Sequence, residues 1–178
     1  GLGWQEEEYE ASGIPFDQRV KTFWETLDIC QSLWTGGPVS HKGEIFEFND
    51  IWCHPTPPQG SDIPLLFGVK MTEFNAQKIA KIGHGWIPIK TSRDFISEGS
   101  EKLNHAFKEA GRDDKPRIRG QLPTCVDSNG VPSVELTLKE LEKSMEAGLE
   151  EIEVFPINFA QSPDHLREVL ELIGELKK

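Results

Sequence analysis

The second part of the sequence alternates short apolar runs with amphipathic segments, and this alternation limits the fold more than any other feature. Apolar runs lie within residues 64–69, 86–89, 117–126 and 152–155, and each is followed by apolar residues at three- and four-residue steps. Strands that alternate with helices at roughly 30-residue spacing indicate consecutive βαβ units and a parallel sheet. The predicted fold class is therefore α/β, as an open doubly wound sheet or as part of a (β/α)8 barrel.

The helices between these strands are predicted from their apolar faces. Gly83, Gly111 and Gly148 follow the first three of them, as expected where a helix stops. The last helix is expected over residues 163–176. The residues assigned to the four inner faces are Phe74, Ile79, Ala80 and Ile82, then Phe95, Ile96, Leu103, Ala106 and Phe107, then Val134, Leu138, Leu141 and Met145, and finally Leu166, Val169, Leu170 and Ile173.

The first part of the chain has a different pattern. Residues 16–34 carry apolar positions at helical spacing, and a Gly-Gly-Pro sequence at 36–38 stops that helix. Residues 39–52 alternate polar and apolar positions around Gly43, which predicts a short hairpin. A proline-rich connector over residues 55–60 then leads into the parallel sheet.

Size, charge and composition limit the classes of partner. A chain of 178 residues fits a single domain over residues 1–178. The net charge is −11 and no basic block is present, which argues against nucleic acid and anionic membranes as partners. There is no apolar run of about 18 residues and no secretory leader pattern, so we expect a cytoplasmic protein.

The sequence contains no spacing of residues typical of a metal site or of a catalytic nucleophile with its base. The three cysteines, Cys30, Cys53 and Cys125, lie far apart and form no C-x-x-C pair. The five histidines form no i,i+4 pair, so no metal site is predicted. The spacing of residues identifies no catalytic group, and the catalytic residues stay unknown at this level.

Residues 1–89 contain an ordered set of features that together are fairly specific. They are the turn at Gly1 and Gly3 with Trp4 and acidic residues 6–8, the helix block 11–19 with 33–35, the hairpin residues Lys42, Gly43 and Phe46, the connector 54–57, and the strand, helix and strand start within 64–86. In order and spacing they resemble the luciferase-like monooxygenase family, the bacterial-luciferase superfamily of flavin- and deazaflavin-dependent oxidoreductases. The resemblance implies a TIM barrel, of which this chain matches the C-terminal half with a small hairpin insertion.

The resemblance also implies a cofactor site. The cofactor would be FMN or the deazaflavin coenzyme F420, with a slight preference for the deazaflavin, and it would serve hydride transfer on a small-molecule substrate. The phosphate is expected at the loop after the first parallel strand, where a helix N-terminus suits an anion. The cofactor-binding residues expected from the resemblance are Gly68, Val69, Lys70, Met71 and Thr72, together with Gly1, Gly3 and Trp4 of the N-terminal turn.

Other interpretations of the same sequence stay open. Four strands cannot close a barrel. We therefore expect the chain either to form a homo-oligomer or to be completed by an N-terminal segment. The alternative function is a non-catalytic truncated half-barrel that acts through assembly, driven by an uncovered apolar sheet face. A weaker alternative is a phosphate-binding isomerase or lyase barrel, because phosphate sites at strand ends occur in unrelated barrels.

Overall fold

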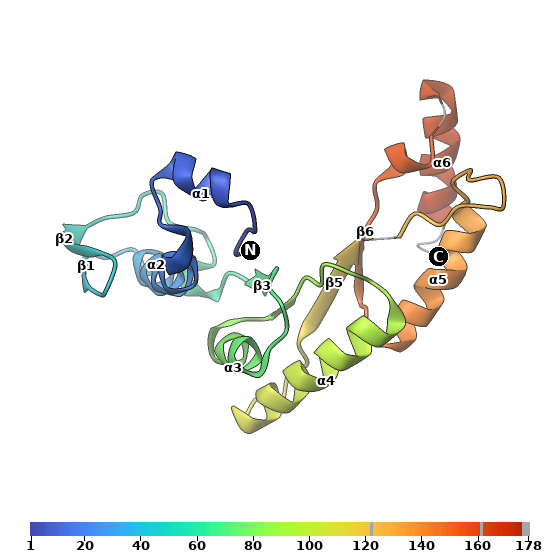
Figure 1. Cartoon of the computed structure of the whole chain (residues 1–178). Helices are drawn as coiled ribbons and strands as arrows, with labels where there is room; N and C mark the ends of the chain where they lie inside the picture. Colours follow the sequence, from blue (N-terminus) through green and yellow to red (C-terminus); the bar gives the residue numbers. More distant parts are fainter. Residues whose placement is uncertain (122, 161, 176–178) are drawn as a thin grey trace. The chain divides into compact units, whose positions relative to one another are not determined.

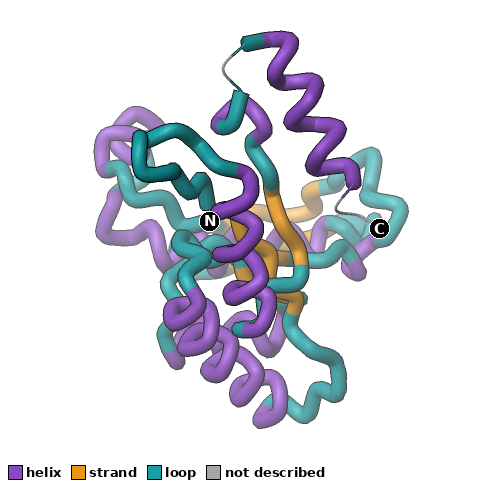
Figure 2. Tube along the Cα trace, turned by 90° about the vertical axis from the view of Figure 1, so that its right-hand side faces the viewer, coloured by secondary structure: helices purple, strands orange, loops and turns teal. Residues whose placement is uncertain are grey.

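The computed structural model (Figures 1 and 2) describes residues 1–121, 123–160 and 162–175. It divides into two compact units. The first unit spans Gly1–Pro64 and the second spans Leu65–Lys178. We describe each unit by itself. Within the described residues, no helix has both the length and the apolar character needed to cross a membrane.

The first unit is a helical segment followed by a hairpin, as its sequence predicts. The expected helix forms after a 3-10 turn, and the expected hairpin is antiparallel with Gly43 in its turn. The proline-rich connector is irregular and ends in a 3-10 turn. The elements are α1 (Glu6–Ser12), η1 (Phe16–Gln18), α2 (Arg19–Leu33), β1 (Val39–Lys42), β2 (Glu47–Ile51) and η2 (Gly60–Asp62).

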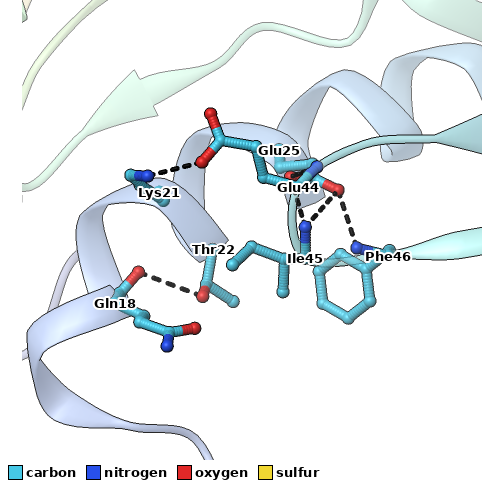
Figure 3. A network of polar contacts seen from close by, with 7 residues as sticks. All are labelled: Gln18, Lys21, Thr22, Glu25, Glu44, Ile45 and Phe46. Carbon is cyan, nitrogen blue, oxygen red and sulfur yellow. Dashed lines mark hydrogen bonds and ion pairs between the residues drawn. The ribbon is translucent and has the colours of Figure 1, made fainter.

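A single carboxylate on α2 fastens the hairpin turn (Figure 3). Glu25 accepts hydrogen bonds from the backbone N–H groups of Ile45 at 3.1 Å and Phe46 at 2.8 Å. The ring of His41 on β1 lies 3.0 Å from the same carboxylate. Burial alone would raise the pKa of Glu25, but the hydrogen bonds from Phe46, His41 and Ile45 outweigh burial and hold it below its ordinary value. Glu25 is therefore a charged anchor for the turn.

We expect Glu25→Gln to loosen this turn selectively. A neutral amide oxygen accepts weaker hydrogen bonds than a carboxylate, so the Ile45 and Phe46 amides should exchange with solvent about tenfold faster. Because folding lowers the pKa of Glu25, its contribution is complete above the unfolded pKa and is lost as pH falls through the folded pKa. Hydrogen exchange between pH 7 and pH 3, corrected for intrinsic rates, measures both effects. Equal protection in the variant and the wild type would contradict this role.

The second unit is a four-stranded parallel sheet with the strand order β3-β4-β5-β6. The strands therefore follow one another in space as they do in sequence, as expected for consecutive βαβ units. In Figure 1, β5 and β6 lie next to each other with α4 and α5 beside them. The elements are β3 (Leu66–Phe67), α3 (Glu73–Ile82), β4 (Gly85–Trp86), α4 (Arg93–Glu109), β5 (Arg117–Gln121), α5 (Val134–Glu146), β6 (Glu151–Glu153), η3 (Pro156–Asn158) and α6 (Pro163–Glu175).

The core of this unit centres on Trp86. Its side chain is 1% exposed and lies against Gly99 of α4, where an added Cβ would come within 2.2 Å of the indole ring. The indole Nε1–H donates to the carbonyl of Val69 at 2.9 Å. Trp86 thus joins the helix layer to the loop that follows β3. Phe67, Ile79 and Phe107 are also buried in this unit.

The expected helix faces are correct in outline and wrong at particular positions. Phe74, Met145 and Leu170 are about half exposed, at 54%, 52% and 51%. The buried face of α5 instead contains Thr137 and Ser144, whose hydroxyls find partners: Thr137 accepts from the Cys125 N–H, and Ser144 donates to the Thr91 carbonyl. Hydroxyls satisfied in this way can replace apolar residues in a core. Leu176, expected to end the last helix, lies outside the described residues.

The sheet face turned away from the helices is charged on β5 and β6, which differs from the uncovered apolar face expected from the sequence. Ile118 is buried, and an added Cβ on Gly120 would meet Leu149, so the alternate residues of β5 point to the other side. Those residues form ion pairs with β6: Arg117 with Glu151, and Arg119 with Glu153 at 3.0 Å. We call these four side chains the charge ladder. Each is between 33% and 44% exposed.

Candidate functional site

The loop between β3 and α3, residues 68–72, is held in place through its carbonyl groups. Trp86 donates to the Val69 carbonyl, and the Asn75 side-chain amide donates to the Lys70 carbonyl at 2.9 Å. Val69 and Met71 are buried, with 4% and 7% of their surface exposed. The loop is therefore anchored from the protein side, while Gly68 is half-buried and Lys70 and Thr72 are exposed.

The backbone N–H groups of this loop, unlike its carbonyl groups, are mostly without hydrogen-bond partners in the described chain. Within the described part of the chain, the N–H groups of Val69, Lys70 and Met71 donate no hydrogen bond. Thr72 is the N-cap of α3, and its Oγ1 accepts from the Asn75 N–H at 3.2 Å. Its own O–H is left to donate. Unused amides and a hydroxyl before a helix N-terminus can hold an oxyanion such as a phosphate.

Lys70 lies in a small group of charges with α4. Lys102 donates to Glu98 at 2.6 Å, and this hydrogen bond lowers the pKa of the Glu98 carboxyl, with a further contribution from the charge of Lys70. Lys70 also borders a pocket of about 150 Å³ beside Trp86 and Phe95. Its charge is thus shared with Glu98 and is only partly available to an anion at the loop.

The remaining predicted cofactor residues belong to the first unit. Gly1 and Gly3 border a pocket of about 250 Å³ with Tyr9, whose hydroxyl donates to the Leu2 carbonyl. Gly3 has φ of +69°, a conformation that favours glycine, and an added Cβ would lie 3.2 Å from the Tyr9 ring. Trp4 is 80% exposed. The structure thus groups Gly1 with Gly3 in one unit and residues 68–72 in the other.

A third pocket, which the sequence analysis did not identify, lies at the carboxyl ends of β4, β5 and β6. It has a volume of about 320 Å³, and we call it the mouth pocket. Parallel strands bring their carboxyl ends to one edge, which is where the active sites of barrel enzymes lie. The residues that follow each predicted strand could therefore have indicated this pocket from the sequence. The lining residues are Ile87, Pro88, Ile89, Lys90, Thr91, Gln121, Pro123, Thr124 and Glu153.

His84 has a structural contact at the opposite ends of the strands. Its Nδ1 accepts the Leu65 N–H at 3.1 Å, and its backbone N–H donates to the Leu65 carbonyl at 2.8 Å. This agrees with the structural role that its position at a strand start suggests. Across the described ranges, no group of three or more potential metal ligands is present, and the three cysteines are free.

Comparison with known proteins identifies relatives in sequence. Residues 1–139 match the family model described as luciferase-like monooxygenase. The uncharacterized protein Rv0953c of Mycobacterium tuberculosis is 36% identical over 119 residues, which cover 66% of this chain and 41% of that protein. The chain therefore spans less than half the length of this curated relative.

Solved structures share the fold. Monooxygenase RslO1 from Streptomyces bottropensis superposes with a TM-score of 0.62 at 17% identity, over 96% of this chain and 55% of its own. The coenzyme F420-dependent tetrahydromethanopterin reductase from Methanopyrus kandleri also gives a TM-score of 0.62, at 14% identity, over 88% of this chain and 61% of its own. The four-stranded parallel unit is thus part of a luciferase-like TIM barrel.

Proposed function

Because the chain belongs to the luciferase-like monooxygenase family, we propose that it functions as part of a flavin- or deazaflavin-dependent oxidoreductase. We further propose that residues 68–72 hold the cofactor phosphate. The bound cofactor supplies the hydride chemistry, while the protein binds it, orients it and excludes water. The observation that carries the proposal is the loop itself: its Val69 and Lys70 carbonyls accept hydrogen bonds, and its amides at Val69, Lys70 and Met71 donate none in the described chain.

The residues of the loop suit this role in complementary ways. The three amides and the Thr72 hydroxyl supply donors at the N-terminus of α3, which favours negative charge. Val69 stands where the family has a second glycine; the residue is buried, and its N–H donates no hydrogen bond to the described chain. Lys70 adds a positive charge that it shares with Glu98. Gly68 places no side chain at the start of the loop.

The cofactor we put first is the deazaflavin F420. Residues 1–19 resemble the deazaflavin-using members, and the tetrahydromethanopterin reductase of the same fold depends on coenzyme F420. The family resemblance also implies that Gly1, Gly3 and Trp4 bind the cofactor and that residues 1–178 form a single domain. FMN is the second choice, because it presents a similar ring system and the same phosphate.

The complete activity belongs, in this proposal, to a closed barrel. Among the described strands, β3 and β6 each pair with one neighbour only, so each has a further edge available for pairing. The charge ladder makes the exposed face of β5 and β6 poorly suited to apolar pairing between two copies. We therefore propose that a complementary segment, supplying the remaining strands of the barrel, completes the active protein in preference to a homodimer of this chain.

The double substitution Lys70→Ala with Thr72→Ala should weaken cofactor binding by about 1–3 kcal/mol, because it removes a charge and a hydroxyl from the phosphate site. Fluorescence titration with F420 and with FMN measures the change. Thr72→Ser is the matched control, since it keeps the hydroxyl and the N-cap of α3. Thermal unfolding of all variants accounts for any loss of the cap. Titration curves that coincide with the wild type would remove the site from these residues.

A further inference from the structure

We infer that the mouth pocket binds a small organic carboxylate with an apolar body. That this pocket is the substrate site of an oxidoreductase rests on the proposed function. The binding of a carboxylate itself follows from the pocket alone. The charge of the pocket, its hydrogen-bonding groups, its apolar wall and its size each limit what it can hold.

The charge of the pocket favours an anion. Lys90 forms no ion pair with any described residue, and it follows β4 at the edge of the pocket. The one carboxylate in the lining belongs to Glu153, and Arg119 neutralises it through an Nε–Oε1 ion pair of 3.0 Å. The charge ladder thus leaves Lys90 as the uncompensated charge. A cationic ligand would meet Lys90 without a free carboxylate to offset the repulsion.

The lining of the pocket also offers hydrogen-bond donors. The hydroxyl of Thr124 accepts from the Asn158 side-chain amide at 3.3 Å, so its own O–H can donate to a ligand. The carboxamide of Gln121 adds two more potential donors from the end of β5. Carboxylate oxygens can accept several hydrogen bonds, and those made to a charged acceptor are stronger than neutral ones. The polar part of the pocket therefore matches a carboxylate better than an alcohol or a ketone.

An aliphatic wall stands beside these donors. Ile89 immediately precedes Lys90 and is 78% exposed, although its side chain is large and apolar. Pro88 and Ile87 continue the wall toward the sheet, where Pro88 is buried. A ligand with an apolar body would cover Ile89 while its carboxylate reaches Lys90. The volume of about 320 Å³ is at the lower end of small-molecule sites, which suits a molecule with a single ring.

Benzoate and benzamide test this inference, because they have nearly the same shape and differ in charge. Titration of the ¹⁵N-labelled chain with each compound, without any cofactor, reports binding through the backbone amides of the pocket. We expect benzoate to bind about tenfold more tightly than benzamide, as a charge-assisted hydrogen bond to Lys90 would produce. The amides of Lys90, Thr91 and Thr124 should show the largest shifts.

Two substitutions should move benzoate affinity in opposite directions. Lys90→Met should abolish the preference for benzoate over benzamide, and Lys90→Arg should keep it. Glu153→Gln should strengthen benzoate binding several-fold, because it releases the positive charge of Arg119 from its ion pair and removes the one carboxylate among the described lining residues. Lys81→Met, which removes the same charge from the end of α3, is the matched control and should change nothing.

Several results would overturn the inference. Equal affinity for benzoate and benzamide, unchanged benzoate binding in Lys90→Met, or shifts located away from the pocket would each do so. The outcome is separable from that of the proposed function. Benzoate binding without any F420 or FMN binding would support the pocket and count against the cofactor site, while the reverse result would do the opposite.

Discussion

Replacing Trp86 with alanine should lower the free energy of unfolding of the second unit by about 3–5 kcal/mol, the range for a large buried aromatic residue. The side chain is 1% exposed, and its removal leaves a cavity beneath α4. It also leaves the Val69 carbonyl without the indole donor that holds it at 2.9 Å. The loop of the proposed phosphate site should therefore loosen. Urea unfolding followed by circular dichroism, with hydrogen exchange of residues 69–72, measures both effects.

Gly99 provides the internal control for this prediction. Gly99→Ala alone should be destabilising, because its Cβ would lie 2.2 Å from the Trp86 ring. In a Trp86→Phe background the smaller ring leaves room for that methyl group, so the same substitution should cost less. The two effects should thus be non-additive, as expected for residues in contact. Additive effects, or a Trp86→Ala loss below about 1 kcal/mol, would contradict the central place of Trp86.

Replacing Arg112 with alanine should cost the same unit about 2–4 kcal/mol, because one guanidinium makes several contacts at once. It donates to the carbonyl of Ala80 at 3.2 Å and to that of Gly83 at 2.6 Å, at the C-terminal end of α3. It also lies 4.0 Å from the centre of the Phe107 ring and donates to Asp114 at 2.8 Å. A cation at this end of a helix is favourable. Chemical unfolding gives the loss directly.

Arg112→Lys and Asp114→Asn separate these contributions. Lysine keeps the charge but cannot serve two carbonyls and a carboxylate together, so it should recover less than half of the loss. The hydrogen bond from Arg112 lowers the pKa of Asp114, but that side chain is 55% exposed. Solvent screening should then limit the effect of Asp114→Asn to about 1 kcal/mol or less. If Asp114→Asn cost as much as Arg112→Ala, the ion pair and not the helix end would be the important contact.

The order of elements follows from the sequence because it depends on local patterns. The hydrophobic period predicts each helix of the second unit, and a glycine marks the end of the first three. The strands are shorter than predicted, as at β3 and β4, because a strand needs hydrogen-bonded neighbours as well as apolar residues. The cofactor loop is predicted from the family resemblance, and its place between a strand and a helix follows the same local pattern.

Other features could not be predicted because their partners are distant in sequence. Ser144 is buried because it donates to the Thr91 carbonyl, 53 positions earlier. The two carbonyls bound by Arg112 lie 29 and 32 positions away. The charge ladder depends on the register between β5 and β6, which places Arg119 opposite Glu151 and next to Glu153. Only the three-dimensional arrangement reveals that such polar residues find partners, and the mouth pocket depends on the same arrangement.

The most direct test of the account compares each cofactor with its counterpart that lacks the phosphate. F420 against its phosphate-free deazaflavin core, and FMN against riboflavin, differ at the group that residues 68–72 are proposed to hold. We expect the phosphorylated member of one pair to bind at least about tenfold more tightly, with ¹⁵N amide shifts concentrated at Val69, Lys70, Met71 and Thr72. Equal affinity within both pairs, no binding of either phosphorylated cofactor, or shifts elsewhere in the chain would contradict the account.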